Sequence, residues 1–304
     1  MRAAVIEELA GEPIIRDVPV PEPASGERLV EITTAALNPA DLVYAAGIRL
    51  QPSFPYVLGL EGIGHLEDGS RVYVPMARAP HGTFAEYCIA NSVIPVPEAV
   101  ADAQALGVGI AGTTGWLCLM WKGALKPGES VLVMGATGAV GQVVVQAAAA
   151  LGASKVVAVG RDRDTLAGLL ERGATDIIEL SGDYASSLID AAEGGFDLVV
   201  DSLFGEPLMA AIQATRMGGR IVNLGMRAGR SMDLNGIALK GKDLLSCDIS
   251  HAPAAQISDA FAHLVELVQQ GRITTNHSAV PLENVAEVWR RQPSSPHQKL
   301  LVAM

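Results

Sequence analysis

The sequence predicts an α/β protein in which a doubly wound parallel sheet is combined with a β-rich domain. Residues 131–160 show a strand pattern, a glycine-rich turn, a helix pattern and a second strand pattern. Strand and helix patterns alternate from there to about residue 248, whereas residues 1–100 contain short strands separated by turn signals. With 304 residues, 49% of them hydrophobic, the chain is long enough for two domains.

The segment VLVMGATGAVG at 131–141 has the layout of a dinucleotide-binding turn. Glycines recur there at three-residue spacing, and Ala136 stands in place of the first glycine of the usual G-x-G-x-x-G. A pyrophosphate binds backbone N–H groups at a helix N-terminus, and glycine lets the backbone approach it. The alternative is a structural turn without a nucleotide. The residues expected to bind the cofactor are Gly135, Ala136, Thr137, Gly138, Ala139 and Val140.

The end of the second predicted strand favours NADPH over NADH. Gly160 stands where an NAD site has an acidic residue, and Arg161 and Arg163 follow it. Guanidinium groups bind phosphate in a bidentate manner, so we assign Gly160 and both arginines to the cofactor site. Asp162 argues the other way, since a shift in register would place an acid in the pocket. The alternative is a solvated charge run that opens the next helix.

Composition excludes several classes of function. The net charge of −11 argues against a nucleic acid or an anionic membrane as partner. No apolar run is long enough to span a bilayer, and the N-terminus does not resemble a signal peptide. Cys88, Cys118 and Cys247 fit no metal or disulfide framework, so we expect a reduced, cytoplasmic setting.

The flanking regions add a short helix, a helical connection and a returning tail. Asn38 is expected to cap a helix that starts at Pro39, with Asp41 in its first turn. Residues 102–121 have helical spacing, and we place a glycine–threonine break at 112–115. The tail contains a helix within 254–271, a strand at 274–280, a second helix and a closing strand, and it is expected to return to the first domain.

Motifs along nearly the whole chain resemble the medium-chain dehydrogenase/reductase superfamily, in its zinc-free quinone oxidoreductase branch. Each motif alone is weak, but together and in this order they are strong. They are NPAD at 38–41, GLEGIG at 59–64, DGSRV at 68–72, HGTFAEY at 81–87, TTGW at 113–116, GATGAVG at 135–141, DLVVD at 197–201 and GGRIV at 218–222.

The resemblance implies a GroES-like catalytic domain at 1–112 and 251–304 and a Rossmann domain at 113–250. It implies NADPH as cofactor, a small-molecule carbonyl or quinone as substrate, and a homodimer. Thr114 matches a threonine that lies near the nicotinamide in the family, and Gly225 matches a strand end beside the cofactor.

The resemblance also bears on metal. Zinc-binding relatives carry cysteine where Asn38 lies and histidine where Leu60 lies, and neither residue here is a zinc ligand. Glu61, His65 and His81 remain as imaginable ligands, but we interpret the histidines as loop residues and Glu61 as a structural acid. We therefore expect no metal.

Without zinc, hydrogen-bond donors must stabilise the oxyanion that forms when hydride reaches an enone. The candidates for catalysis are Asn38 and Tyr44 as donors, with Asp41 orienting Asn38 or a water molecule. The alternatives are helix capping for Asn38 and Asp41 and a wall or core position for Tyr44. An arginine that commonly follows the NPxD motif in the family is replaced by Ala45 or Ala46.

Three functions remain open at this point. The first is an NADPH-dependent reductase of enones or quinones. The second is an aldehyde or enoyl-thioester reductase on the same fold. The third is a non-catalytic NADPH-binding sensor.

Overall fold

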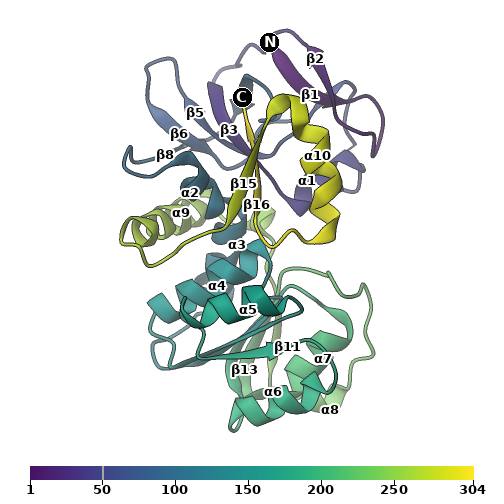
Figure 1. The fold of residues 1–304 in the computed structure, drawn as a ribbon, viewed down its shortest axis with the longest axis vertical. Coiled ribbons are helices and arrows are strands. Elements are labelled where there is room, and N and C mark those ends of the chain that lie inside the picture. Colours follow the sequence, from purple (N-terminus) through teal and green to yellow (C-terminus); the bar gives the residue numbers. More distant parts are fainter. Residues whose placement is uncertain (50) are drawn as a thin grey trace. The chain divides into compact units, whose positions relative to one another are not determined.

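The computed structural model describes residues 1–49 and 51–304 and divides into two compact units (Figure 1). We call Met1–Ile110 with Thr275–Met304 the terminal unit, and Ala111–Thr274 the central unit. The chain thus passes between the units after residues 110 and 274, whereas the sequence suggested 112 and 250. Helix α9 (Ala254–Gln269) therefore belongs to the central unit. The assignment of 1–112 and 251–304 to one functional domain stays a prediction.

The central unit is built on one parallel sheet with the strand order β11-β10-β9-β12-β13-β14. This is the order of a dinucleotide-binding sheet: strands are added on one side of β9 up to β11, and from β12 onward they are added on its other side. The α/β prediction is confirmed. The strands are β9 (Ser130–Met134), β10 (Lys155–Gly160), β11 (Asp176–Glu179), β12 (Phe196–Asp201), β13 (Thr215–Asn223) and β14 (Asp243–Ser246).

Helices join the strands of this sheet (Figure 1). Helix α4 is apolar because most of it is buried: the valines at 143–145 and the alanines at 147 and 148 are 0% exposed. Leu132 and Val157 of the sheet belong to a separate buried cluster, together with Leu188 and Leu208 of two later helices. The helices are α3 (Ile110–Leu117), a π-helix (Cys118–Lys122), α4 (Ala139–Ala150), α5 (Arg163–Leu170), α6 (Tyr184–Ala192), α7 (Gly205–Gln213), α8 (Gly236–Leu239), a 3-10 turn (Ile249–His251) and α9.

The break predicted at 112–115 is wrong. Those residues lie inside α3, and the interruption falls between α2 (Asp102–Gly107) and α3. A Cβ atom on Gly109 would lie 2.1 Å from Oε2 of Glu61, so the break is set by a tertiary contact. Gly115 is helical, and its lack of a side chain leaves room for Val144, whose Cγ2 would lie 2.6 Å from an added Cβ.

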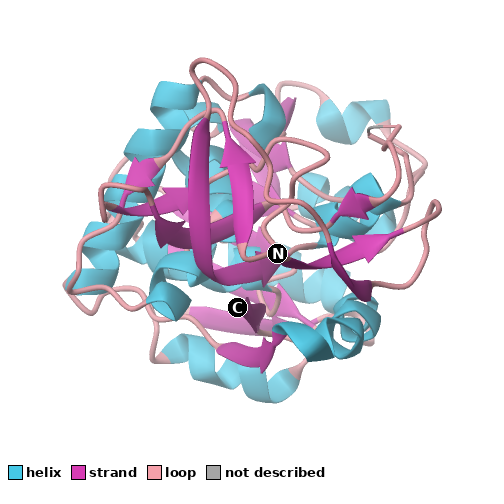
Figure 2. Ribbon diagram, turned by 90° about the horizontal axis from the view of Figure 1, so that it is seen from above, coloured by secondary structure: helices cyan, strands magenta, loops and turns pink. Residues whose placement is uncertain are grey.

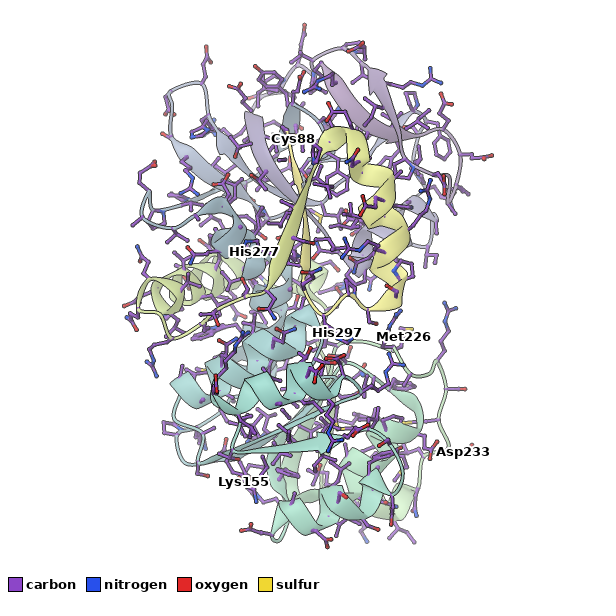
Figure 3. All side chains as sticks on the ribbon, in the orientation of Figure 1. Cys88, Lys155, Met226, Asp233, His277 and His297 are labelled. Atoms are coloured by element: carbon purple, nitrogen blue, oxygen red, sulfur yellow. The ribbon has the colours of Figure 1, made fainter. Side chains whose placement is uncertain are left out.

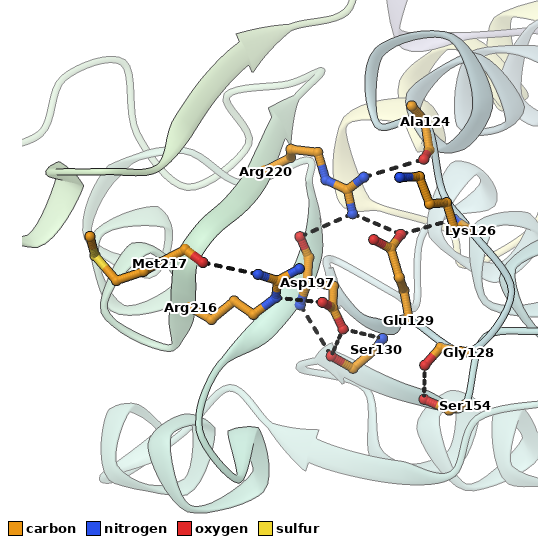
Figure 4. A network of polar contacts seen from close by, with 10 residues as sticks. All are labelled: Ala124, Lys126, Gly128, Glu129, Ser130, Ser154, Asp197, Arg216, Met217 and Arg220. Atoms are coloured by element: carbon orange, nitrogen blue, oxygen red, sulfur yellow. Dashed lines mark hydrogen bonds and ion pairs between the residues drawn. The ribbon is translucent and has the colours of Figure 1, made fainter.

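A polar network ties together the starts of β9, β12 and β13 (Figure 4). Oδ2 of Asp197 accepts hydrogen bonds of 2.8 Å from both the backbone N–H and the hydroxyl of Ser130. Arg216 Nε donates to Oδ1 of Asp197 at 2.5 Å, and Arg220 pairs with Glu129 at 2.8 Å. These bonds hold the amino ends of the strands together, so this network lies at the edge of the sheet opposite the carboxyl ends of the strands.

The terminal unit contains the sheet order β15-β16-β3-β5-β6-β8, with β7 also paired to β3, and a smaller sheet β2-β1-β4. Both chain ends lie in this unit (Figure 2). The strands are β1 (Arg2–Ile6), β2 (Ile14–Asp17), β3 (Arg28–Leu37), β4 (Tyr56–Val57), β5 (Glu61–His65), β6 (Arg71–Val74), β7 (Tyr87–Ala90), β8 (Ile94–Pro95), β15 (His277–Pro281) and β16 (Lys299–Ala303).

The tail returns to the first hundred residues, as predicted. Strand β16 pairs antiparallel with β3, so that Leu301 lies opposite Ala36. On the other side of β3, Ala36 lies opposite Glu61 of β5. The helices of this unit are α1 (Pro39–Ala45), α2 and α10 (Val285–Arg291), with 3-10 turns at Leu282–Asn284 and Gln292–Ser294. Within the described ranges, no helix is long and apolar enough to cross a membrane.

Candidate functional site

The glycine-rich turn lies at the carboxyl end of β9, beside the point where the strand order reverses. Gly135 has a φ of +85°, which favours glycine. A Cβ on Gly141 would lie 2.4 Å from the carbonyl oxygen of Gly135, so only glycine lets α4 start this close to the turn. The first backbone N–H groups of α4, from Ala139 onward, cannot be satisfied within the helix. This turn can therefore accept an anion.

Ala136 fills the first glycine position without blocking the turn. Its side chain is fully buried, and its backbone N–H, like that of Gly135, donates to the carbonyl of Val159 at 2.8 Å and 2.9 Å respectively. The turn is thereby fastened to the end of β10. Gly138, at the start of α4, has only the oxygen of Gly135, at 3.5 Å, near the position of an added Cβ. The turn is therefore open beside Gly138.

The end of β10 is shaped by Gly160 and Thr137. A Cβ on Gly160 would lie 2.5 Å from Cγ2 of Thr137, so the absence of a side chain at 160 leaves room for the turn. Asp162 caps α5 by accepting the N–H of Thr165 at 2.8 Å. Asp162, the acid that argued for NADH, thus caps the start of α5. Arg161 is exposed.

Two further predicted cofactor residues are in the central unit. Gly225 follows β13, where a Cβ would lie 2.7 Å from the carbonyl oxygen of Ser202. Asn223 holds this edge together by donating to the carbonyl of Gly225 at 2.7 Å and to Oδ2 of Asp201 at 2.6 Å. Burial raises the pKa of Asp201, although these hydrogen bonds oppose the shift. Thr114 is half-buried within α3, and Arg163 is exposed as the first residue of α5.

In the terminal unit, a buried polar cluster surrounds Glu61. Its Oε1 accepts Nδ2 of Asn38 at 2.9 Å and Nζ of Lys299 at 2.6 Å. Its Oε2 accepts the hydroxyl of Tyr73 at 2.7 Å and the N–H of Ile110 at 2.6 Å. Glu61 is 0% exposed and Lys299 is 3% exposed, so the two opposite charges are neutralised inside the protein.

Sheet register brings this cluster together. Glu61 is the first residue of β5 and Lys299 the first residue of β16, and both strands flank β3 near its end at Leu37. Asn38 comes directly after β3, so its side chain meets both charged groups. Asn38 is the N-cap residue of α1, as predicted, but its side chain makes no capping hydrogen bond, because its amide bonds Glu61 and Lys299.

Asp41 lies in the first turn of α1, next to this cluster. Its Oδ2 accepts the N–H of Asn38 at 2.7 Å, and the residue is 3% exposed. Burial raises the pKa of Asp41 to about 7, with the charge of Glu61 adding to the shift and that of Lys299 opposing it. Tyr44 is half-buried three residues further along α1.

Comparison with known proteins identifies the fold's relatives. The family model described as zinc-binding dehydrogenase matches residues 139–270. One component of the phenolphthiocerol/phthiocerol polyketide synthase of Mycobacterium tuberculosis is 29% identical over 95% of this chain, and this chain spans 14% of its length. The zinc-type alcohol dehydrogenase-like protein C337.11 of Schizosaccharomyces pombe is 30% identical over 85% of this chain and 81% of its own.

This chain belongs to the medium-chain dehydrogenase/reductase superfamily. Within it, the chain falls in the quinone oxidoreductase-like branch. The solved quinone oxidoreductase of Thermus thermophilus, also solved with NADPH, has a TM-score of 0.84, is 26% identical, and covers 100% of both chains.

Most of the residues predicted to bind the cofactor or to act in catalysis fall into two groups in the structure. The glycine-rich turn, Gly160, Arg161 and Gly225 belong to the carboxyl edge of the central sheet. Asn38 precedes α1 in the terminal unit, Asp41 lies in its first turn and Tyr44 lies near its end. Sequence reasoning missed Lys299 and Tyr73. The one available signal for Lys299 was a charged residue opening the otherwise apolar strand KLLVA.

The residues present do not fit the zinc ion named by the family model. Zinc takes thiolate, imidazole or carboxylate ligands. Leu60 offers no donor atom, and the carboxylate of Glu61 is already engaged by four donors, one of which is the Lys299 ammonium. His65 is the last residue of β5, and His81 forms an isolated β-bridge with Val57. Neither histidine is among the four hydrogen-bond donors to the carboxylate of Glu61. Over residues 1–49 and 51–304, no three His, Cys, Asp or Glu side chains form a metal-binding group.

Proposed function

We propose that this protein is an NADPH-dependent oxidoreductase that reduces a quinone or an α,β-unsaturated carbonyl compound without zinc. The observation that carries the proposal is the glycine-rich turn at the strand-order reversal, closed by Gly160 in place of an acid. The likeness to a quinone oxidoreductase that was solved with NADPH supports the same cofactor and substrate class.

The cofactor-binding roles divide between backbone and side chains. Gly138, Ala139 and Val140 would face the pyrophosphate with backbone N–H groups, because the start of a helix binds anions. Arg161 would bind the 2′-phosphate, with Arg163 beside it in sequence. The absence of an acid at position 160 removes the repulsion that a phosphate would meet there. Thr114 and Gly225 would complete the nicotinamide end.

Bound NADPH would supply a hydride. In the terminal unit, the Tyr44 hydroxyl would donate a hydrogen bond to the oxygen on which negative charge develops. Asn38 would act as a positioning residue and not as a donor to the oxyanion, because its Nδ2 already donates to Glu61 and, at 3.4 Å, to the carbonyl of Ala36. Asp41 would hold the proton that completes the reduction, since a pKa of about 7 leaves the carboxyl partly protonated near neutral pH.

The reaction balances with one hydride and one proton. For an enone, the hydride adds to the β-carbon, the C=C electron pair moves to give an enolate, and the enolate α-carbon takes the proton. For a quinone, the same hydride and proton give the hydroquinone. In both cases NADPH is oxidised and the acceptor gains two electrons.

The test is NADPH oxidation at 340 nm with a quinone, an enone, an aldehyde and an enoyl thioester, each with and without a chelator. We expect turnover of quinone or enone that resists the chelator. Arg161→Ala should weaken NADPH binding at least tenfold while leaving NADH binding unchanged, whereas Arg290→Ala, an exposed arginine of the terminal unit, should change neither. Loss of activity on chelation would contradict the zinc-free mechanism.

An enoyl-thioester reductase is the second candidate, because similarity to a polyketide synthase extends over 95% of this chain. Faster turnover of the enoyl thioester than of the free enone in the same assay would favour it. Tight NADPH binding without turnover of any acceptor would favour a sensor. A cytoplasmic location stays a prediction.

We also propose a homodimer formed at the edge strand β14. An edge strand presents unpaired backbone groups to another chain. The segment before β14 carries large exposed apolar residues: Ile237 is 85% exposed and Met226 is 62% exposed, and Met226 and Asp233 lie at separate places along one loop (Figure 3). Sedimentation should give a dimer for the protein and a monomer for Ile237→Asp if this face is the interface.

A further inference from the structure

Two of the cysteines, which are far apart in the sequence, meet inside the central unit. Cys118 is the first residue of the π-helix, and Cys247 directly follows strand β14. The Cys118 thiol donates a hydrogen bond to the sulfur of Cys247. The spacing of the cysteines in the sequence indicated no disulfide framework, so it is the fold that makes a pair of these two.

Strand β13 holds both residues in place. The π-helix contacts β13, and the backbone N–H of Cys247 donates to the carbonyl of Asn223, the last residue of that strand, at 2.8 Å. The N–H of Gly123 closes the wide turn of the π-helix by donating to the carbonyl of Cys118 at 2.9 Å. Such turns are rare and are frequent at functional sites. Both sulfur atoms are therefore carried by backbone that hydrogen bonds fix.

The two thiols are not equivalent. Cys118 is 0% exposed and Cys247 is 4% exposed, so Cys247 is the one that a small solute can reach. The hydrogen bond from Cys118 and the charge of Lys122 lower the pKa of Cys247, although burial and Asp248 oppose the shift. The same hydrogen bond and burial raise the pKa of Cys118. Cys247 is thus the sulfur suited to react as a thiolate, with a second thiol beside it.

We propose that Cys118 and Cys247 are a redox pair that a peroxide converts into a disulfide. The Cys247 thiolate attacks one oxygen of hydrogen peroxide: an S–O bond forms, the O–O bond breaks, and the departing hydroxide takes up the proton that Cys247 had released. The Cys118 sulfur then attacks the sulfenic sulfur. The S–S bond forms, the S–O bond breaks, and the hydroxide leaves with the Cys118 proton as water. Two thiols are oxidised and one peroxide is reduced to two waters.

The disulfide would act on the carboxyl edge of the central sheet. The sulfur atoms must approach to about 2.05 Å, which draws the chain after β14 toward the π-helix. The N–H of Cys247 bonds the carbonyl of Asn223, and the Asn223 side chain donates to Gly225. Oxidation should therefore weaken NADPH binding, and reduction should restore it. This effect, unlike the disulfide itself, rests on the proposed cofactor-binding role of Gly225.

The experiment treats the whole chain with hydrogen peroxide and compares the wild type with Cys118→Ser and Cys247→Ser. The wild type should lose two of its three free thiols, and a non-reducing peptide map should join Cys118 to Cys247 within one chain. Dithiothreitol should restore all three thiols. Cys118→Ser should instead accumulate sulfenic or sulfinic acid at Cys247, whereas Cys247→Ser should keep both remaining thiols.

Cys88→Ser is the matched control. Cys88 is also 0% exposed, but it belongs to the apolar core of the terminal unit (Figure 3), so its replacement should leave the disulfide unchanged. If a serine variant does not fold, the alanine variant takes its place, because it buries no hydroxyl. A wild-type disulfide that joins two chains or includes Cys88, or wild-type Cys247 that oxidises without forming a disulfide, would overturn the redox pair.

Fluorescence titration measures the consequence for the cofactor. Oxidised wild type should bind NADPH with a Kd at least about threefold higher than reduced wild type, and Cys247→Ser should show no change on the same treatment. A complete disulfide with unchanged NADPH affinity would contradict the effect on the sheet edge. Thiol counts and peptide maps require neither substrate nor NADPH, so a failed reductase assay would leave the redox pair intact.

Discussion

Replacing Gly160 with alanine should damage the cofactor site through one contact, with Thr137. The new Cβ would lie 2.5 Å from Cγ2 of Thr137, while carbon atoms in good contact are about 3.5–4.0 Å apart. One side must move by about 1 Å, and overpacking of this kind costs about 1–3 kcal/mol. Because Thr137 is part of the glycine-rich turn, the displacement should also weaken NADPH binding.

A second substitution isolates that contact. Thr137→Ser removes Cγ2 and keeps the hydroxyl, which leaves the new Cβ no closer than 3.1 Å to Oγ1 and 3.3 Å to the Cβ of residue 137. Gly160→Ala/Thr137→Ser should therefore be more stable than Gly160→Ala, with a coupling energy of about 1–2 kcal/mol in a double-mutant cycle.

Denaturant unfolding measures stability, and fluorescence titration measures NADPH affinity for the same four proteins. Thr137→Ser alone should cost only about 1 kcal/mol, the value of one buried methyl group. If the double variant is as unstable as the sum of the two single variants, the contact does not explain why position 160 is glycine. A selective loss of NADPH binding without any loss of stability would also contradict this reasoning.

Three further predictions test other parts of the structure. Gly141→Ala should abolish NADPH binding, because its Cβ would lie 2.4 Å from backbone, whereas Gly168→Ala, in open space on α5, should bind normally and gain about 0.5–1 kcal/mol. The folded pKa of Asp41, about 7, exceeds the unfolded value of about 3.9, so the stabilisation from its protonated form is present below pH 4 and is lost as pH rises through 7. The loss in free energy of unfolding is on the order of 4 kcal/mol. Asp41→Asn should therefore flatten the plot of unfolding free energy against pH over that window. Alkylation followed by mass spectrometry should modify Cys247 before Cys88, because a thiol hydrogen bond lowers the pKa of Cys247 while burial raises that of Cys88 to about 12; the reverse order would contradict it.

The central unit could be predicted because its signals are local. A strand, a turn and a helix that are adjacent in the sequence fix the glycine-rich turn, and the absence of an acid at Gly160 is visible without a structure. The reason for glycine at 160 was not visible, since Thr137 lies 23 positions earlier and only the parallel pairing of β9 and β10 brings the two together. The misplaced helix break has the same origin, because the contact that requires glycine at 109 is with Glu61 and not with its neighbours in the sequence.

In the terminal unit, local rules gave the wrong partner for Asn38. An asparagine that precedes a proline and has an aspartate three positions later is a good helix cap, and α1 does begin at Pro39. The side chain nevertheless bonds Lys299, 261 positions away, because a buried Glu61–Lys299 pair requires further hydrogen bonds. The start of α1 needs Asn38 less, because Asp41 already accepts the Asn38 N–H there.

This cluster links the tail of the chain to the candidate reaction site. Glu61 can be neutralised only when β16 has paired with β3 and delivered Lys299 to the end of that strand. Until then a carboxylate would be buried next to Asn38 without its cation, which is costly in a dry interior. The returning strand therefore does more than complete a sheet. It supplies the charge that orders Asn38, and through the Asn38 N–H it influences the Asp41 carboxyl that we propose as the proton carrier.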